Sequence, residues 1–255
     1  MQALAITRGI PSSFAHALVQ HAPSAPIDVD AARREHAAYV DALGALGFEV
    51  LVLPADERYP DGCFVEDCAV VHEGRALLTR TGAPSRRGEV EGLREVLAGL
   101  AQLETMQAPA TLEGGDCLRI GRRLYIGLGA RTNEAGVARA REVFGPVGLE
   151  VIGVPIGALL HLKCVCSSPG PGHVLVAAGT VAPETFADVA AIVVPAEEAH
   201  AANCVAAGGA VLIPSGCPVT ATALQAAGYR VMTIDNEQIR RADGALTCMS
   251  LRIER

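Results

Sequence analysis

Short apolar runs broken by glycine-containing turns recur along the chain at a regular interval. In four of five such segments, one apolar run is followed by a turn and a second apolar run, which is the pattern of a β-hairpin. Each segment begins near a cysteine, and successive cysteines of this set are 49, 47, 40 and 44 residues apart: Cys68, Cys117, Cys164, Cys204 and Cys248. The hairpin is therefore a repeating unit.

Between the hairpins the apolar positions change to helical spacing. Residues 86–101 carry apolar side chains at 90, 93, 96, 97 and 100, and residues 132–148 begin with Thr132 as the expected N-cap, ahead of the acidic Glu134. Helical stretches are also expected over 30–47, 183–190 and 217–228. A further strand follows each helix, over 48–54, 103–109, 149–156, 191–195 and 229–235, and a strand over 2–7 opens the chain.

Repeats of this length indicate modules that stack or close into a ring. A doubly wound sheet also alternates strands and helices, but it has no hairpin in every module. We therefore predict an α/β fold of five modules in one domain, 1–255, with helices outside and strands facing a central opening. The first module is split, because its opening strand and its hairpin lie far apart in the sequence.

Composition narrows the class of protein. The 255 residues are 50% hydrophobic and carry a net charge of −7, with twenty Arg and a single Lys, Lys163. No apolar run approaches the ~20 residues that span a bilayer, and the first residues lack the pattern of a signal peptide, so a cytoplasmic protein without a membrane segment is expected. The acidic balance argues against nucleic acid as a partner and is compatible with a cationic small molecule.

The eight cysteines do not form a recognisable metal motif. No C-x2-C pair occurs, and the C-x-C at Cys164 and Cys166 is too tight for a zinc knuckle. In a long chain without export signals, we expect most of these thiols to be reduced and buried.

In a ring, equivalent positions of the modules converge on the centre. Carboxylates, one imidazole and one thiol occupy them here: Glu66, Asp67, Glu113, Asp116, His161, Asn203 and Cys248. Asp116 and Asn203 are equally typical of turns and caps, and Cys68, Cys117, Cys164 and Cys204 are typical of apolar packing. Cys248 differs in its neighbours, because His161 can generate a thiolate and Glu113 can orient that imidazole.

At this point the motifs resemble those of a known family. "FVEDCAVV", "TLEGGDCL", "GLGARTNEAG", "LLHLKC", "AANCV" and "GALTCMSLRI" are similar in order and spacing to dimethylarginine dimethylaminohydrolase, a member of the amidinotransferase and deiminase superfamily. The resemblance covers essentially the whole chain. It implies a five-bladed α/β propeller, a homodimer and no metal or organic cofactor.

The resemblance also implies roles for individual residues. Cys248 would be the nucleophile, His161 the general acid and base, and Glu113 their partner. Asp61 would bind the substrate's α-amino group, Glu66 and Asp67 would lie near its guanidinium, and Arg86 and Arg131 would hold its α-carboxylate. A lid over residues 9–25 would contribute Leu18, Phe64 would line the pocket, and Ala242 would offer its carbonyl.

The implied reaction converts methylated arginine, either asymmetric dimethylarginine or monomethylarginine, to citrulline and a methylamine through a thiouronium on Cys248. An arginine deiminase remains an alternative, although those enzymes resemble a pattern with Asp where this chain has Lys163. A carboxylate there suits an unmodified guanidinium, since a dimethylated nitrogen has no N–H to donate. A non-catalytic arginine-binding propeller is a further alternative, but it would not need Cys248 with His161.

Two cysteines depart from the family pattern. Cys164 stands where the relatives carry Ser or Thr, and Cys63 lies in the "PDGCFVED" loop. Together with Cys248 they form a hypothetical inhibitory zinc site.

Overall fold

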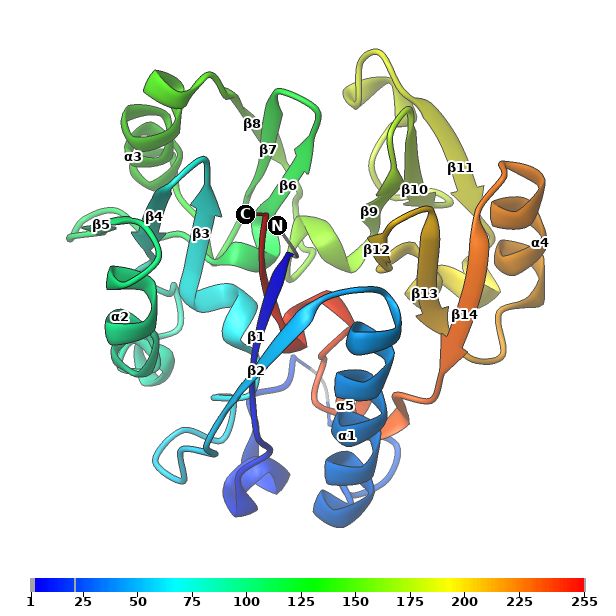
Figure 1. The fold of residues 1–255 in the computed structure, drawn as a ribbon, viewed down its shortest axis with the longest axis horizontal. Helices are drawn as coiled ribbons and strands as arrows, with labels where there is room; N and C mark the ends of the chain where they lie inside the picture. Colours follow the sequence, from blue (N-terminus) through cyan, green and yellow to red (C-terminus); the bar gives the residue numbers. More distant parts are fainter. Residues whose placement is uncertain (1–2, 21, 255) are drawn as a thin grey trace.

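The computed structural model describes residues 3–20 and 22–254, and its strands form five three-stranded sheets around a central axis (Figure 1). In each sheet the first two strands are antiparallel and the third runs parallel to the second. Four sheets are continuous in sequence: β3 (Ala69–His72), β4 (Arg75–Leu78) and β5 (Gln102–Thr105); β6 (Cys117–Ile120), β7 (Arg123–Leu128) and β8 (Glu150–Pro155); β9 (Cys166–Gly170), β10 (His173–Ala177) and β11 (Ala190–Val194); β12 (Val205–Ala207), β13 (Ala210–Pro214) and β14 (Arg230–Ile234).

The fifth sheet joins the two ends of the chain. It consists of β15 (Leu251–Ile253), β1 (Leu4–Arg8) and β2 (Glu49–Leu53), with β15 antiparallel to β1. Ile6 pairs with Leu251 and Leu4 with Ile253, so the last strand closes the ring against the first. The predicted split module and the ring of five modules are confirmed.

The hairpin turns have the backbone that a tight antiparallel turn requires. Between β3 and β4, Glu73 and Gly74 have φ of 46° and 70°, and between β12 and β13, Gly208 and Gly209 have φ of 56° and 75°. Positive φ at both central residues is typical of a type I′ turn, whose twist matches that of the flanking strands. Glycine occurs in these predicted hairpin turns because it adopts positive φ without steric cost.

Helices cover the outside of the ring (Figure 1). They are α1 (Val29–Ala45), α2 (Glu91–Ala98), α3 (Glu134–Phe144), α4 (Pro218–Ala226) and the short α5 (Glu237–Arg241). Leu93 and Leu97 of α2 are fully buried and belong to one apolar cluster with Ile6 and Leu78, strand residues of neighbouring sheets. Burying each leucine contributes roughly 1.5–3 kcal/mol to the free energy of folding, so these contacts stabilise the packing of α2 against the sheets.

Two expectations about helices are wrong. The stretch 183–190 forms only a 3-10 turn, Pro183–Thr185, and Asp188 adopts a φ of 66° that no helix tolerates. The cap of α3 is Asn133 and not Thr132, because the Asn133 side chain accepts the Gly136 N–H at 2.9 Å. Thr132 instead points inward and is buried. None of the described helices is long and apolar enough to cross a membrane.

Candidate active site

A 3-10 turn precedes the innermost strand of every sheet, and these turns contact one another around the axis. They are Val65–Cys68, Gly114–Asp116, Leu162–Cys164, Ala196–Ala202 and Thr247–Met249. Each predicted carboxylate, imidazole or thiol lies in one of these turns or beside it. The ring therefore brings together residues that are up to 182 positions apart, from Glu66 to Cys248.

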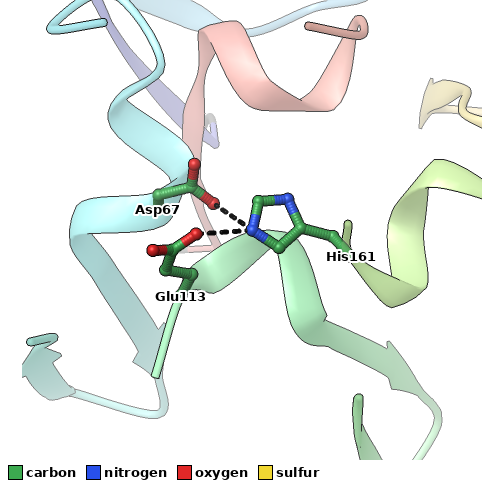
Figure 2. A group of neighbouring side chains, drawn as sticks. All are labelled: Asp67, Glu113 and His161. Atoms are coloured by element: carbon green, nitrogen blue, oxygen red, sulfur yellow. Dashed lines mark hydrogen bonds and ion pairs between the residues drawn. The ribbon is translucent and has the colours of Figure 1, made fainter. Parts of the chain in front are cut away.

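Glu113 and His161 form a buried pair from consecutive modules (Figure 2). Glu113 Oε2 lies 2.6 Å from His161 Nε2, and both side chains are almost completely shielded from solvent. The other oxygen, Oε1, accepts the Ala83 N–H and an Arg131 N–H, each at 3.4 Å. Glu113 is thus held from both sides while it fixes the orientation of the imidazole.

The charges around His161 favour its protonated form. Burial alone would lower the pKa of His161, but Asp67, the Cys164 thiol, Glu113 and Asp116 together raise it well above the ordinary value. Asp67 Oδ1 lies 4.0 Å from His161 Nε2 (Figure 2). The net effect of these charges therefore favours the imidazolium over the neutral imidazole.

Asp67 also belongs to a buried ion-pair network with Arg86. Arg86 Nη1 lies 2.8 Å from Asp67 Oδ2, and its Nε and Nη2 donate to Glu89 at 2.9–3.2 Å. Burial opposes ionisation of Asp67, yet His161 and Arg86 lower its pKa below the ordinary value. Asp67 is therefore a fixed negative charge beside the imidazolium.

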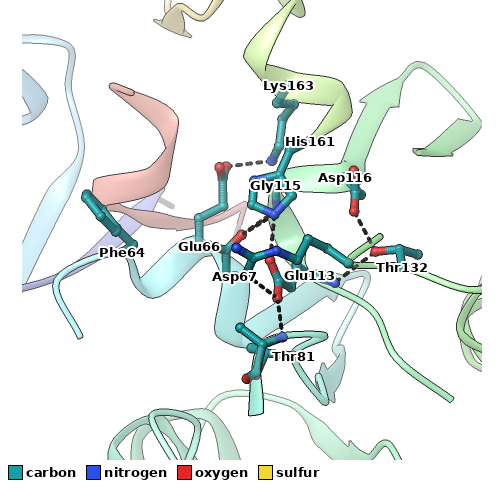
Figure 3. A network of polar contacts seen from close by, with 12 residues as sticks. Phe64, Glu66, Asp67, Thr81, Glu113, Gly115, Asp116, Thr132, His161 and Lys163 are labelled. Carbon is teal, nitrogen blue, oxygen red and sulfur yellow. Dashed lines mark hydrogen bonds and ion pairs between the residues drawn. The ribbon is translucent and has the colours of Figure 1, made fainter. Parts of the chain in front are cut away.

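Both oxygens of Glu66 also have partners, and Figure 3 shows the contact with Lys163. Oε1 accepts Lys163 Nζ at 2.6 Å and Arg252 Nη2 at 3.2 Å, and Oε2 accepts the Thr247 hydroxyl at 2.6 Å. Thr247 immediately precedes Cys248. Glu66 thus links the turn that carries Lys163 to the turn that carries the predicted nucleophile.

Cys248 and Cys164 are the two half-buried thiols of the chain, while the other six cysteines are buried. All eight are free, as expected. Packing is confirmed for Cys68, Cys117 and Cys204, and the half-buried Cys164 also packs against the apolar cluster that contains Cys204. Cys164 has a second role, because it helps to raise the pKa of His161 and that of Cys248. Burial and the charges of Glu66 and Asp67 raise the pKa of Cys248 well above its usual value, so its resting form is the thiol.

The predicted lid is attached to the ring by polar and aromatic contacts. The Leu18 N–H donates to both Asp61 oxygens at 3.1 and 3.2 Å, while the Leu18 side chain is 43% exposed. Phe14 meets Phe64 edge to face, with ring centroids 5.9 Å apart. Ala242 is buried at the end of α5. The structure therefore groups Leu18, Asp61 and Phe64 on one side of the ring's centre.

Only one potential metal-ligand group of three occurs among the described residues. Asp67, Glu113 and His161 offer ligand atoms within 4.8 Å of one another. Arg86 and Arg131 already pair with the two carboxylates of this group. The hypothetical zinc site is wrong, since Cys63, Cys164 and Cys248 form no such group and Cys63 is fully buried.

The ring of five sheets defines the class of fold. Its backbone matches the N-terminal domain of ArgZ, described as an arginine dihydrolase from cyanobacteria, with a TM-score of 0.90 at 16% identity over 100% of this chain and 98% of that one. This is the five-module α/β propeller fold that the sequence predicts.

Closer relatives identify the family. The family model for N,N dimethylarginine dimethylhydrolase, eukaryotic, matches residues 17–194. The N(G),N(G)-dimethylarginine dimethylaminohydrolase of Streptomyces coelicolor is 37% identical over 98% of this chain and 96% of that protein, and the Pseudomonas aeruginosa protein of that name is 37% identical over 88% and 89%. A cysteine-to-serine mutant of the Pseudomonas aeruginosa enzyme, complexed with citrulline, superimposes with a TM-score of 0.94 at 35% identity, covering 99% of this chain and 100% of that one. The chain belongs to the dimethylarginine dimethylaminohydrolase family.

Several polar residues of the site were not recognised from the sequence. Glu89 lies three residues after Arg86, a spacing that signals a helical ion pair, and Arg252 follows Cys248 closely. Thr132 was interpreted as a cap, whereas its hydroxyl contacts Asp116 (Figure 3). For Asp116 and Asn203 the sequence leaves open a place at the centre of the ring or a turn or cap role, and their hydrogen bonds to neighbouring modules favour the first.

Proposed function

We propose that this protein hydrolyses Nω-methylated arginine to citrulline and dimethylamine or methylamine. The similarity to named dimethylarginine dimethylaminohydrolases supports this activity. The observation that carries the proposal is the hydrogen-bonded pair of His161 and Glu113, together with the charge of Asp67, which acts on both His161 and the Cys248 thiol. A cationic guanidinium is complementary to such a site.

The neighbouring side chains suit the two ends of an amino acid. Asp67 is the carboxylate for the guanidinium, and Asp61, docked to the Leu18 N–H, receives the α-amino group. Arg131 is 21% exposed in its side chain and offers N–H groups to the α-carboxylate, whereas all three guanidinium nitrogens of Arg86 already pair with Asp67 or Glu89. Phe64 and the Ala242 carbonyl complete the pocket.

The chemistry begins with charge compensation. Because Glu66 and Asp67 disfavour a Cys248 thiolate, the positive charge of the bound guanidinium offsets them, and the thiol proton is lost to solvent water. The sulfur attacks the central guanidinium carbon, forming a C–S bond and a tetrahedral adduct. His161 gives its proton to the dimethylated nitrogen, the C–N bond breaks, and dimethylamine leaves a thiouronium on sulfur.

Hydrolysis completes the cycle. Neutral His161, oriented by Glu113, takes a proton from water, and the hydroxide attacks the same carbon. The C–S bond then breaks, the electron pair returns to Cys248 sulfur, and the O–H proton of the adduct passes to that sulfur as citrulline departs, which restores the resting thiol. The balance is one methylarginine and one water consumed for one citrulline and one methylamine, without a cofactor.

Selectivity against arginine rests on Lys163. Its ammonium pairs with Glu66 at 2.6 Å, so this position offers no carboxylate to a terminal N–H. A dimethylated nitrogen needs no acceptor there, and we expect the methylated substrates to be preferred. An arginine deiminase on the same fold is the rival activity.

The assembly and the compartment are also proposals. Leu51 and Val52 of the edge strand β2 are 38% and 48% exposed, and an apolar edge suits a homodimer. Light scattering on the purified protein distinguishes a dimer from a monomer. Eight free thiols suit the reducing cytoplasm, which cell fractionation tests.

Release of citrulline and dimethylamine from asymmetric dimethylarginine tests the activity, with arginine as the parallel substrate and Cys248→Ser as the control. Turnover of the methylated substrate by the wild type and not by the variant is expected. Turnover of arginine alone would establish a deiminase instead, and substrate binding without turnover would establish an arginine-binding propeller.

A further inference from the structure

A polar side chain in one module binds the backbone of the next module at three points around the ring. Asp67 Oδ1 accepts the Gly115 N–H at 2.9 Å, Asp116 Oδ1 accepts the Leu162 N–H at 3.0 Å, and Asn203 Oδ1 accepts the Thr247 N–H at 2.9 Å. The three acceptors precede Cys68, Cys117 and Cys204. In each case the bonded amide lies within two residues of Glu113, His161 or Cys248, so these bonds fix the backbone of the reacting groups.

Asp116 reaches two of these groups at once. Its Oδ1 holds the backbone beside His161, and its Oδ2 accepts the Thr132 hydroxyl at 2.5 Å (Figure 3). The same hydroxyl oxygen accepts the Glu113 N–H at 3.1 Å. One carboxylate is therefore bonded, directly or through Thr132, to the backbone of both members of the Glu113–His161 pair.

The surroundings of Asp116 leave little room for an alternative arrangement. The carboxylate is completely buried, and a methyl group added at Gly127 would lie 2.6 Å from its Oδ1. That hypothetical methyl would also lie 3.0 Å from the Leu162 Cβ. Close packing on this side therefore requires a glycine at position 127 and restricts movement of the Asp116 side chain, which keeps its two hydrogen bonds in place.

We propose that Asp116 is the positioning residue of the acid–base pair: it keeps the His161 imidazole and the Glu113 carboxylate in hydrogen-bonding register. This role rests on the proposed function, since it concerns the same reaction. The Asp116 oxygens accept from the Thr132 hydroxyl and the Leu162 N–H, so Asp116 acts on the pair through the two backbones. Its negative charge also favours the imidazolium, together with Asp67, Glu113 and the Cys164 thiol, which face the same ring.

Two substitutions separate positioning from charge. Asp116→Ala removes both hydrogen bonds. Asp116→Asn removes the charge but keeps an oxygen for the Leu162 N–H, and its amide donates to the Thr132 hydroxyl, which has a second lone pair for the Glu113 N–H. Because displacement of a catalytic group by about 1 Å costs on the order of 10²-fold, we expect that loss in kcat for Asp116→Ala, with KM changed less than about threefold. Asp116→Asn should keep kcat within about fivefold of the wild type.

Glu198→Ala is the matched control. Glu198 is also a buried carboxylate that accepts backbone N–H groups, from Val219 at 3.0 Å and Thr220 at 2.8 Å, but it caps α4 at the periphery. The Glu198→Ala substitution should lower the melting temperature of the protein and leave kcat unchanged. If Asp116→Ala does not fold, Thr132→Val, which breaks the link to the Glu113 N–H, replaces it and should lower kcat by about tenfold or more.

Steady-state kinetics of these variants on asymmetric dimethylarginine, with melting temperatures, constitute the experiment. A kcat loss in Asp116→Ala that Asp116→Asn rescues and Glu198→Ala lacks supports the proposal. Wild-type kcat in Asp116→Ala, equal damage in Asp116→Asn, or equal damage in Glu198→Ala overturns it. If the wild type turns over no methylarginine, the proposed function fails instead. A crystal structure of Asp116→Ala then decides: retention of the 2.6 Å Glu113–His161 contact overturns the positioning role and its loss supports it.

Discussion

Glu113 Oε2 and His161 Nε2 lie 2.6 Å apart, although the two residues belong to different modules and are 48 positions apart in the chain. The pair is buried, and Asp67 and Arg131 surround it with one further charge of each sign. An imidazole in this setting keeps its proton and a single orientation. Proton delivery to a leaving amine is what such a pair can do, and several measurable consequences result.

Glu113→Gln removes the charge that orients and protonates His161 while preserving side-chain volume. The amide oxygen still accepts the imidazole N–H, but the negative charge that favours the imidazolium is lost, and we expect kcat to fall by about 10²- to 10⁴-fold with a small change in KM. Initial rates of citrulline formation across substrate concentrations measure both. Glu57→Gln, which alters a carboxylate that binds the lid backbone at Ser12, is the control and should retain kcat. A wild-type kcat in Glu113→Gln would contradict the assignment.

The raised pKa of His161 makes a signed prediction about stability. A group whose pKa is higher in the folded than in the unfolded protein stabilises fully below its unfolded pKa, about 6.5, and this contribution is lost as pH rises through the folded pKa. The difference in free energy of unfolding between wild type and His161→Gln should thus be larger at pH 6 than at pH 9. Urea unfolding at the two pH values measures it.

His36 provides a control of opposite sign. Burial lowers the pKa of His36 to about 4, so the unfolded chain takes up a proton at higher pH than the folded one. The folded protein is therefore destabilised as pH falls from about 6.5 towards 4, and His36→Gln should reduce that acid sensitivity. The same slope for both histidine variants would argue against the charge assignment.

The site leaves no room for a side chain at position 115. A methyl group there would lie 2.6 Å from His161 Nδ1 and 2.9 Å from Asp67 Oδ1. Gly115→Ala should therefore displace the imidazole and lower kcat by about 10²-fold. Gly44 in α1, with no heavy atom within 4 Å of an added methyl, is the control: Gly44→Ala should leave kcat intact and stabilise by ~0.5–1 kcal/mol. Unchanged turnover in Gly115→Ala would rule out the packing argument.

The two half-buried thiols should be the ones that react in the native protein. Brief treatment with iodoacetamide, followed by peptide mass spectrometry, should label Cys164 and Cys248 and leave the six buried cysteines unmodified. Because the pKa of Cys248 is raised, its labelling rate should increase steeply with pH. Added citrulline should protect Cys248. Labelling of Cys63 at a comparable rate would contradict the burial described for it.

The repeat in the sequence predicted most of the fold, because glycines with positive φ and alternating apolar runs are local signals. The prediction of a helix over 183–190 was wrong, because nothing in the composition of this segment indicates the positive φ of Asp188. The predicted N-cap residue of α3 was also wrong. Thr132 and Asn133 both suit an N-cap, and it is the hydrogen bond to the buried Asp116 that turns the Thr132 side chain inward.

The candidate site was predicted through motifs, whereas its internal pairing was not. Resemblance indicated Glu66, Asp67 and Arg86 as substrate residues, but the pairing of Glu66 with Lys163 and of Arg86 with Glu89 depends on contacts between modules. The repeated position of Cys164 predicts a packing residue, and Cys164 does pack against the cluster around Cys204, but it also raises the pKa of His161. Position in a repeat therefore predicts where a side chain packs but not every group that it influences.

The most direct test of the account is to capture the covalent intermediate. The protein is mixed with asymmetric dimethylarginine, quenched in acid within the first turnovers, digested and analysed by mass spectrometry, with Cys248→Ser in parallel. The account predicts a thiouronium adduct on the peptide that contains Cys248, and on no peptide of the variant. An adduct on Cys164, or citrulline formation by Cys248→Ser at the wild-type rate, would contradict it.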